Sequence, residues 1–112
     1  MAAMDGSYLV QYDSDAVVEF AQLVAKEEKK ALLNVVEKLR MLGPKLVPPH
    51  VKLLKGESGL MELRPRQGKT HVRAICRRVG NDYLILALCI KPDKADWDSA
   101  LADARDRAKR YD

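Results

Sequence analysis

The residues of this sequence that could do chemistry are concentrated in one basic stretch near its middle. From position 59 to 78 the sequence reads GLMELRPRQGKTHVRAICRR. After Glu62 it carries six basic side chains and no acid: Arg64, Arg66, Lys69, Arg73, Arg77 and Arg78. Arginine stays charged at physiological pH, and its planar fork can hold two phosphate oxygens. The stretch therefore predicts a site for a polyanion; the alternative is a solvated face on which Glu62 occupies one arginine.

The alternating apolar residues of this stretch indicate that the charges lie on two neighbouring strands. Residues of one parity share a face of a strand, so Arg64 and Arg66 should point away from Met61 and Leu63. Pairing of the two strands could then display four guanidinium groups on one surface: Arg64, Arg66, Arg73 and Arg77. Like charges that share a surface repel one another, and a bound polyanion would offset that cost.

Other patterns that commonly carry chemistry are missing from the sequence. There is no glycine-rich phosphate loop, no serine elbow and no metal-ligand cluster, so no metal or cofactor is predicted. Cys76 and Cys89 lie in strand-like runs and are expected to be reduced core thiols. His50 follows two prolines and is expected on the surface. His71 could be a general base near neutral pH or a plain exposed residue.

The first half of the chain predicts a strand and two helices. A strand is expected over 7–12, followed by apolar residues at helical spacing from Val17 to Leu42. KEEKK at 26–30 is either a solvated stretch of one long helix or the turn between two helices, and we favour a helical hairpin. A connection rich in proline and glycine covers 44–59 and leaves no room for long regular structure.

The second half predicts a sheet and a last helix. Strands are expected over 60–66, 70–79 and 83–90, and GND at 80–82 should form the hairpin turn between the last two. Both alternating sets of the third strand are apolar, which is typical of a central strand covered on both faces. A helix follows over 97–111. The order of elements predicts an α+β fold with helices packed on a mostly antiparallel sheet.

Length and composition agree with one globular domain over 1–112. The chain is 47% hydrophobic and 32% charged, and its net charge of +4 is a weak indication of a nucleic-acid partner. No apolar run approaches the ~20 residues of a membrane span, and the first ten residues lack a secretory signal. We therefore expect a cytoplasmic protein that does not bind membranes.

Short motifs follow one another along the chain in an order that resembles a known family. They are K-x-L-x-G, G-L-x-E-L-R, an arginine-led strand, an apolar strand ending in lysine, and a helix with A-x-x-R. The matching residues are Lys52, Leu54, Gly56, 59–64, Arg73, 84–90, Lys91, Ala104 and Arg107. This order resembles the RelE/HigB superfamily of toxins from type II toxin–antitoxin systems, in its phage-derived HigB-like branch. The resemblance covers most of the chain.

The resemblance implies a RelE-like microbial RNase fold and a metal-independent endoribonuclease that cleaves mRNA, often on the ribosome, and so inhibits translation. In such enzymes the RNA 2′-hydroxyl attacks the adjacent phosphate. Carried over, the catalytic candidates are Arg64 and Arg73, which would stabilise the phosphorane, and Lys91, as an RNA contact or proton-transfer group. The remaining candidates for RNA binding are Lys52, Lys55, Arg66, Lys69, His71 and Arg77.

The sequence also departs from the family pattern where the third strand ends. Ala87 stands where a polar residue or histidine is common, and Cys89 where an aromatic residue is common. Pro92 replaces a second lysine, and Asp96 and Trp97 stand where K-T-P often follows. A weakened toxin or a different target RNA therefore stays open.

The resemblance further implies three partners: mRNA, the ribosome and a cognate antitoxin, usually a helix-turn-helix protein. The alternatives to an enzyme are a non-catalytic RNA- or ribosome-binding module on the same scaffold and a protein that binds only another protein.

Overall fold

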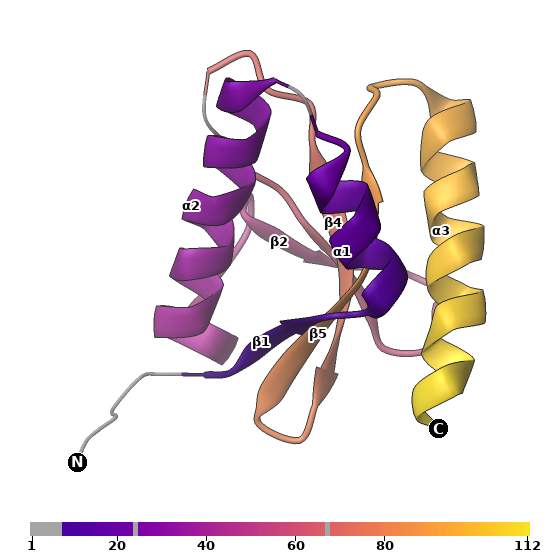
Figure 1. Ribbon diagram of the computed structural model, residues 1–112. Coiled ribbons are helices and arrows are strands. Elements are labelled where there is room, and N and C mark those ends of the chain that lie inside the picture. Colours follow the sequence, from indigo (N-terminus) through magenta and orange to yellow (C-terminus); the bar gives the residue numbers. More distant parts are fainter. Residues whose placement is uncertain (1–7, 24, 67) are drawn as a thin grey trace.

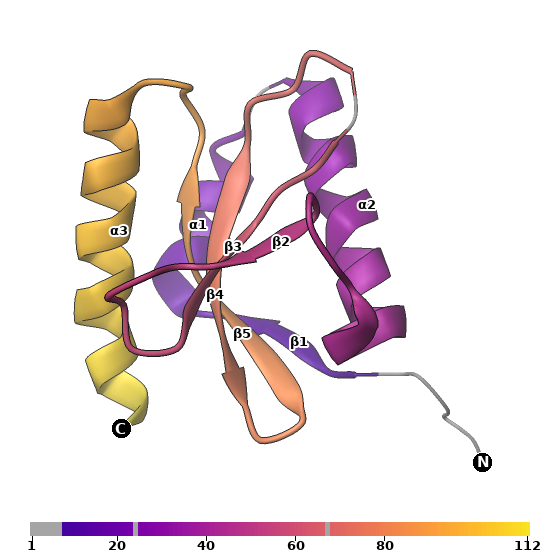
Figure 2. The same ribbon diagram turned by 180° about the vertical axis from the view of Figure 1, so that it is seen from behind.

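A five-stranded sheet forms the centre of the molecule, with helices on both of its faces (Figures 1 and 2). The computed structural model describes residues 8–23, 25–66 and 68–112. The elements in chain order are β1 (Val10–Tyr12), α1 (Ser14–Ala21), α2 (Lys26–Leu42), a 3₁₀ turn (Gly43–Lys45), β2 (Val51–Leu53), β3 (Leu60–Leu63), β4 (Arg73–Val79), β5 (Asp82–Cys89), α3 (Lys94–Ala108) and a second 3₁₀ turn (Lys109–Tyr111).

The sheet has the order β1-β5-β4-β3-β2, and only the β1–β5 pair is parallel among its described strands. The predicted α+β fold with a mostly antiparallel sheet is therefore confirmed. β5 is an interior strand between β1 and β4, and its residues from Tyr83 to Cys89 are all buried. They divide between two cores, one under α1 and α2 and the other under α3. The apolar run on both faces of β5 predicted this position correctly.

The helical hairpin is confirmed, but KEEKK is not its turn. These residues begin α2, and the chain reverses between Ala21 and Lys26. The first strand is shorter than predicted, because β1 begins at Val10; residue 7 lies outside the described residues. The connection over 44–59 contains a short strand, β2, that its prolines and glycines had concealed. The GND turn is confirmed, and Gly80 has the left-handed φ of 63° that favours glycine.

The basic strands are shorter than the sequence predicted. β3 ends at Leu63 and β4 begins at Arg73, so Arg64, Arg66 and His71 lie on the loop between them. Pro65 has no N–H and cannot continue a strand ladder, which explains the early end of β3. The ten-residue strand expected over 70–79 is therefore wrong for its first three residues. The consequence is that most of the predicted site lies on a loop held by two strand ends.

One connected group of polar contacts fastens α1 and α3 to the sheet. Beyond the end of β1, the guanidinium of Arg107 on α3 donates to the Leu86 carbonyl at 2.9 Å and to Glu19 of α1 at 2.8 and 3.0 Å. Glu19 in turn accepts from the Leu88 amide at 3.0 Å. The Leu86 carbonyl and the Leu88 amide, both on the edge of β5 beyond β1, therefore have hydrogen-bond partners. The A-x-x-R arginine is thus a structural residue of this fold.

Candidate functional site

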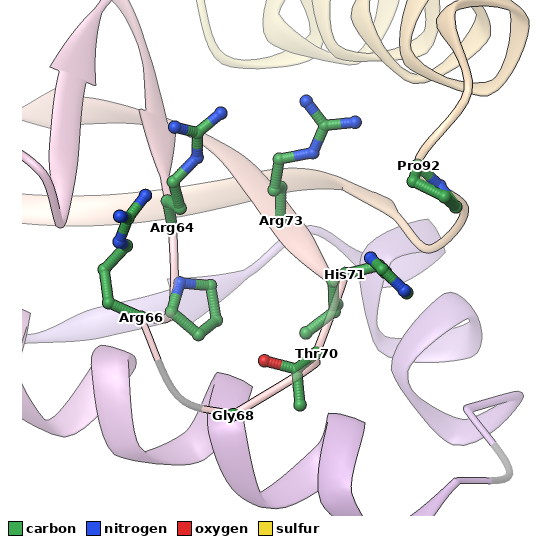
Figure 3. Close-up of a pocket in the computed structure, with 9 residues that line it drawn as sticks. Arg64, Arg66, Gly68, Thr70, His71, Arg73 and Pro92 are labelled. Atoms are coloured by element: carbon green, nitrogen blue, oxygen red, sulfur yellow. The ribbon is translucent and has the colours of Figure 1, made fainter.

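Three arginines converge on one open cleft at the end of the sheet where β3 ends and β4 begins (Figure 3). We call it the arginine cleft. Its volume is about 470 Å³, and it is lined by Arg64, Pro65, Arg66, Gly68, Thr70, His71, Val72, Arg73 and Pro92. No carboxylate is among these lining residues of the described chain, so the wall is cationic and polar. The cleft therefore suits an anion.

The loop that carries His71 is held by a carboxylate from the opposite half of the chain. Glu28, in the first turns of α2, accepts from the His71 amide at 2.7 Å and from the Val72 amide at 2.7 Å. The helical hairpin thereby fixes the backbone on one side of the cleft. On the other side the Arg64 amide donates to the His50 carbonyl at 2.8 Å, which ties the end of β3 to the start of β2.

The two best catalytic candidates share one buried carboxylate. Arg64 Nη2 lies 3.3 Å and Arg73 Nη1 lies 3.6 Å from Glu62 Oε2. This oxygen is buried and makes no hydrogen bond within the described part of the chain, so both contacts are electrostatic rather than well-formed hydrogen bonds. The pairing of Arg64 with Glu62 that the sequence left as an alternative is thus present. It brings Arg64 and Arg73 side by side.

Arg73 is held more firmly than Arg64, with a side chain 18% exposed against 41%. Its guanidinium carbon lies 4.7 Å from the centre of the Trp97 ring, within the range of a cation–π contact, and Nη2 donates to Cys89 Sγ at 3.5 Å. Burial raises the pKa of the Cys89 thiol to about 11, so the sulfur stays protonated and uncharged. Arg73 is therefore pre-positioned by an aromatic ring, a thiol and a carboxylate.

The predicted lysines do not line the cleft. Lys52 is exposed on β2, and Lys55 is exposed in the following loop beside a neighbouring groove. Lys69 is exposed between two lining residues. Lys91 is also exposed, and its amide donates to Asp96 at 3.0 Å, while the next residue, Pro92, reaches the cleft. The roles of these lysines stay predictions.

Arg77 is separated from the other arginines. It shares the α3 face of β4 with Arg73, as its parity predicted, but Nη1 donates to Asp112 at 3.0 Å and the side chain borders a different cavity. Arg78 lies on the opposite face, bonded to the Gly80 carbonyl at 2.9 Å. The predicted surface of four arginines is therefore wrong in its extent: Arg64, Arg66 and Arg73 meet, and Arg77 does not.

Sequence reasoning missed several residues that shape this site. His50 is half-buried; burial lowers its pKa, with further contributions from Lys38 and Arg66, so its imidazole is predominantly neutral near pH 7. Glu28 accepts a hydrogen bond from the amide of His71, which lies 43 residues later in the sequence, and no local sequence pattern predicts a contact over that separation. Trp97 could have been noticed as the single tryptophan of the chain. Within the described residues no group of three or more potential ligands is placed to hold a metal ion.

Comparison with solved structures shows that the fold is that of RelE-type toxins. A double mutant of the Escherichia coli toxin RelE in the free state superimposes with a TM-score of 0.63, at 13% identity, over 86% of this chain and 96% of that one. The RelBE2 toxin–antitoxin complex of Mycobacterium tuberculosis gives a TM-score of 0.51, at 19% identity, over 78% and 94%.

Residues 19–109 match the family model described as Phage derived protein Gp49-like (DUF891). The chain belongs to this family. Together with the shared fold, the match confirms the resemblance to the RelE/HigB superfamily that the motifs predict. Among curated proteins none matches the sequence significantly. No helix in the described part of the chain is long and apolar enough to cross a membrane.

Proposed function

We propose that this protein is the toxin of a type II toxin–antitoxin system and a metal-independent endoribonuclease that cleaves mRNA in the arginine cleft. The observation that carries the proposal is the meeting of Arg64, Arg66 and Arg73 on a cleft without a carboxylate in its described wall. Family membership and the RelE-type fold support the same conclusion. The expected target is mRNA on the ribosome, in the cytoplasm.

The proposed reaction is an internal transfer of the phosphate. The 2′-oxygen forms a bond to phosphorus, the bond to the 5′-oxygen breaks, and the products are a 2′,3′-cyclic phosphate and a 5′-hydroxyl. Charge accumulates on the phosphoryl oxygens in the transition state, where fixed cations stabilise it most. Arg73, already oriented by Trp97 and Glu62, and Arg64 beside it would supply that stabilisation.

The reaction also needs a group that takes the 2′-proton and one that gives a proton to the 5′-oxygen. Histidine exchanges protons near neutral pH, and His71 lines the cleft on the side opposite Arg64 (Figure 3). Lys91, next to Pro92 at the edge of the cleft, is the second candidate. Either group could take either role, and the pH dependence of cleavage in single variants would distinguish them.

The test is a double substitution, Arg64→Gln with Arg73→Gln. We expect it to abolish growth arrest and RNA cleavage while the protein stays folded, because glutamine keeps bulk but removes the phosphate-stabilising charge. The matched control is Arg40→Gln with Lys30→Gln, which removes the same charge from exposed positions of α2. Cleavage by the parent should survive EDTA and leave cyclic phosphate ends. Full activity of the folded double variant would overturn the proposal.

An antitoxin partner belongs to the same proposal, because the second solved structure is of a toxin–antitoxin complex. An antitoxin that neutralises the arginine cleft would carry acidic residues, and a helix-turn-helix domain is expected beside them. Co-expression of the adjacent small gene should rescue growth and yield a complex on purification. Growth arrest that no neighbouring gene relieves would refute this partner.

The second candidate function, an RNA- or ribosome-binding module without catalysis, is favoured by two observations. Glu62 already contacts both Arg64 and Arg73, and Lys91 does not line the cleft. Salt-sensitive binding to RNA or ribosomes without new RNA ends would establish this function instead.

A further inference from the structure

A second cavity lies next to the arginine cleft, and its composition differs from that of the cleft. We call it the tryptophan groove. It has a volume of about 420 Å³ and is lined by Lys52, Leu53, Leu54, Lys55, Glu57, Trp97 and Leu101. It lies between the edge strand β2 with its following loop and the first turns of α3. Apolar side chains and an aromatic ring are thus combined with two lysines.

The groove and the arginine cleft are linked by shared lining residues. A small cavity of about 90 Å³ shares Lys52 with the groove and Arg64 with the cleft, and Glu62 is also in its wall. Arg73, which lines the cleft, lies 4.7 Å from the Trp97 ring, which lines the groove. A strand that places one phosphate on Arg64 and Arg73 is therefore within reach of Trp97, because Arg73 contacts both sites.

The groove fits a nucleobase better than a purely anionic or purely apolar ligand. Leu53 is 68% exposed, so the apolar lining is open to solvent, and Trp97 offers an aromatic ring beside it. Lys52 and Lys55 can meet the phosphates on either side of a base. Glu57, the only acid among the described residues of the wall, is paired with Arg105 at 2.7 Å, which offsets its charge. A flat aromatic group joined to phosphates matches this combination.

We propose that the tryptophan groove is a base-binding subsite, in which one unpaired base of the RNA next to the scissile phosphate stacks on Trp97. Lys52 and Lys55 bind the phosphates that flank this base. The inference rests on the proposed function, because the subsite is defined relative to a scissile phosphate in the arginine cleft. The RNA would run from that cleft toward α3. Because stacking accepts every base, the subsite adds affinity and requires an unpaired nucleotide more than a particular sequence.

Trp97 is the only tryptophan of the chain, so its fluorescence reports on this groove and on the adjoining Arg73, and the comparison with an abasic ligand separates the two. The probe is a 2′-O-methyl RNA pentamer, which lacks the attacking hydroxyl and is not cleaved. Titration of the parent protein should quench Trp97 fluorescence with the same affinity that an independent binding assay gives. A pentamer with an abasic residue at the stacking position should bind about tenfold more weakly and quench less.

A chemical double-mutant cycle separates stacking from the contact between Trp97 and Arg73. Trp97→Leu should weaken binding of the full pentamer about tenfold, but binding of the abasic pentamer much less, whereas Trp97→Phe should retain most of the affinity. Loss of the arginine contact alone would weaken both pentamers equally. Unequal weakening therefore supports the subsite, and equal weakening overturns it.

The outcomes also distinguish this inference from the proposed function. If the pentamer binds in an Arg64-dependent and salt-dependent manner but leaves Trp97 fluorescence unchanged, the groove is not a base site and the proposed function survives. If cleavage-competent RNA is neither bound nor cut, the proposed function fails and the subsite fails with it. The fluorescence measurement needs no variant, so a Trp97→Leu protein that does not fold leaves the test intact.

Discussion

The charge balance around Glu62 gives a prediction with two effects of opposite sign. Glu62→Gln removes the buried negative charge that lies 3.3 Å from Arg64 and 3.6 Å from Arg73. The three charges sum to +1 in the parent and to +2 in the variant. We expect the variant to bind RNA more tightly and to be less stable, because the carboxylate attracts both arginines and repels any phosphate that binds them.

The gain in RNA affinity can be estimated from the geometry. A phosphate bound to both guanidinium groups would lie about 6 Å from the Glu62 carboxylate. This distance adds one more contact between arginine and phosphate to the distance between Glu62 and the arginines. Coulomb's law gives a repulsion of about 0.7 kcal/mol at a dielectric constant of about 80 and about 1.4 kcal/mol at about 40. Removal of this repulsion should tighten binding by about three- to tenfold. The salt dependence of binding should steepen by up to about 0.7 in log–log slope.

The loss of stability arises because Arg73 is largely buried and keeps its charge. Its remaining partners, the Trp97 ring and Cys89 Sγ, compensate only in part for the missing carboxylate. Removal of one partner of a fully buried pair costs about 3–5 kcal/mol, and since Arg64 stays half-exposed we expect about 1–3 kcal/mol here. Urea unfolding measures this change.

The assay is the affinity for non-cleavable 2′-O-methyl RNA at about 50 mM and about 200 mM salt. The matched control is Glu37→Gln, which changes the net charge by the same amount at an exposed pair with Arg40. It should leave affinity nearly unchanged. The reasoning is refuted if folded Glu62→Gln protein binds RNA more weakly than the parent, because the loss of the carboxylate that holds the arginines together would then outweigh the removal of its repulsion of phosphate.

Three further predictions concern the scaffold of the site. Burial alone would raise the pKa of Asp13, but hydrogen bonds from Tyr111 and from the Asp15 amide lower this pKa overall. The charged carboxylate therefore stabilises the folded state at neutral pH, and this stabilisation is lost as acid protonates it. Asp13→Asn should therefore cost about 1–3 kcal/mol in urea unfolding at pH 7, and the deficit relative to the parent should shrink below about pH 4. Glu28→Ala should abolish hydrogen-exchange protection of the amides of residues 71 and 72 and lower RNA cleavage, while Glu28→Gln retains part of both; unchanged protection in Glu28→Ala would contradict the anchoring role. Arg107→Lys should lower the free energy of unfolding by about 1–3 kcal/mol at unchanged RNA affinity, and a loss of affinity in the folded variant would contradict its purely structural role.

The order and type of the elements could be predicted because each depends on local patterns. The apolar run of β5 on both faces indicated an interior strand covered on both sides, and helical spacing gave both helices of the hairpin. The strand ends could not be placed by alternation, since the charged residues after Leu63 continue the alternation although Pro65 ends the ladder. β2 was missed because its three residues gain strand geometry from pairing with β3, not from their own composition.

The site was predicted in part for the same physical reason. Strand pairing is a local rule, and it predicted that Arg64 and Arg73 lie on one surface, as the register of β3 and β4 places them. Their catalytic role came from the family resemblance and stays a prediction. Parity alone extended the surface to Arg77, because it cannot show that the C-terminal residue Asp112 returns to that end of β4. The contacts of Glu28 and Trp97 join segments far apart in the sequence, and only the packing of the helices on the sheet creates them.

The place of Glu62 bears on how the free protein keeps its arginines ready. Two neighbouring guanidinium groups repel each other, and a buried carboxylate between them holds both without filling the cleft, whose described lining does not include Glu62. Its contacts at 3.3 and 3.6 Å are longer than good charge-assisted hydrogen bonds, and Oε2 makes none in the described part of the chain. The donors of Arg64 are therefore only loosely engaged. A phosphate could take up those donors at little cost, while Glu62 keeps the two side chains together between binding events.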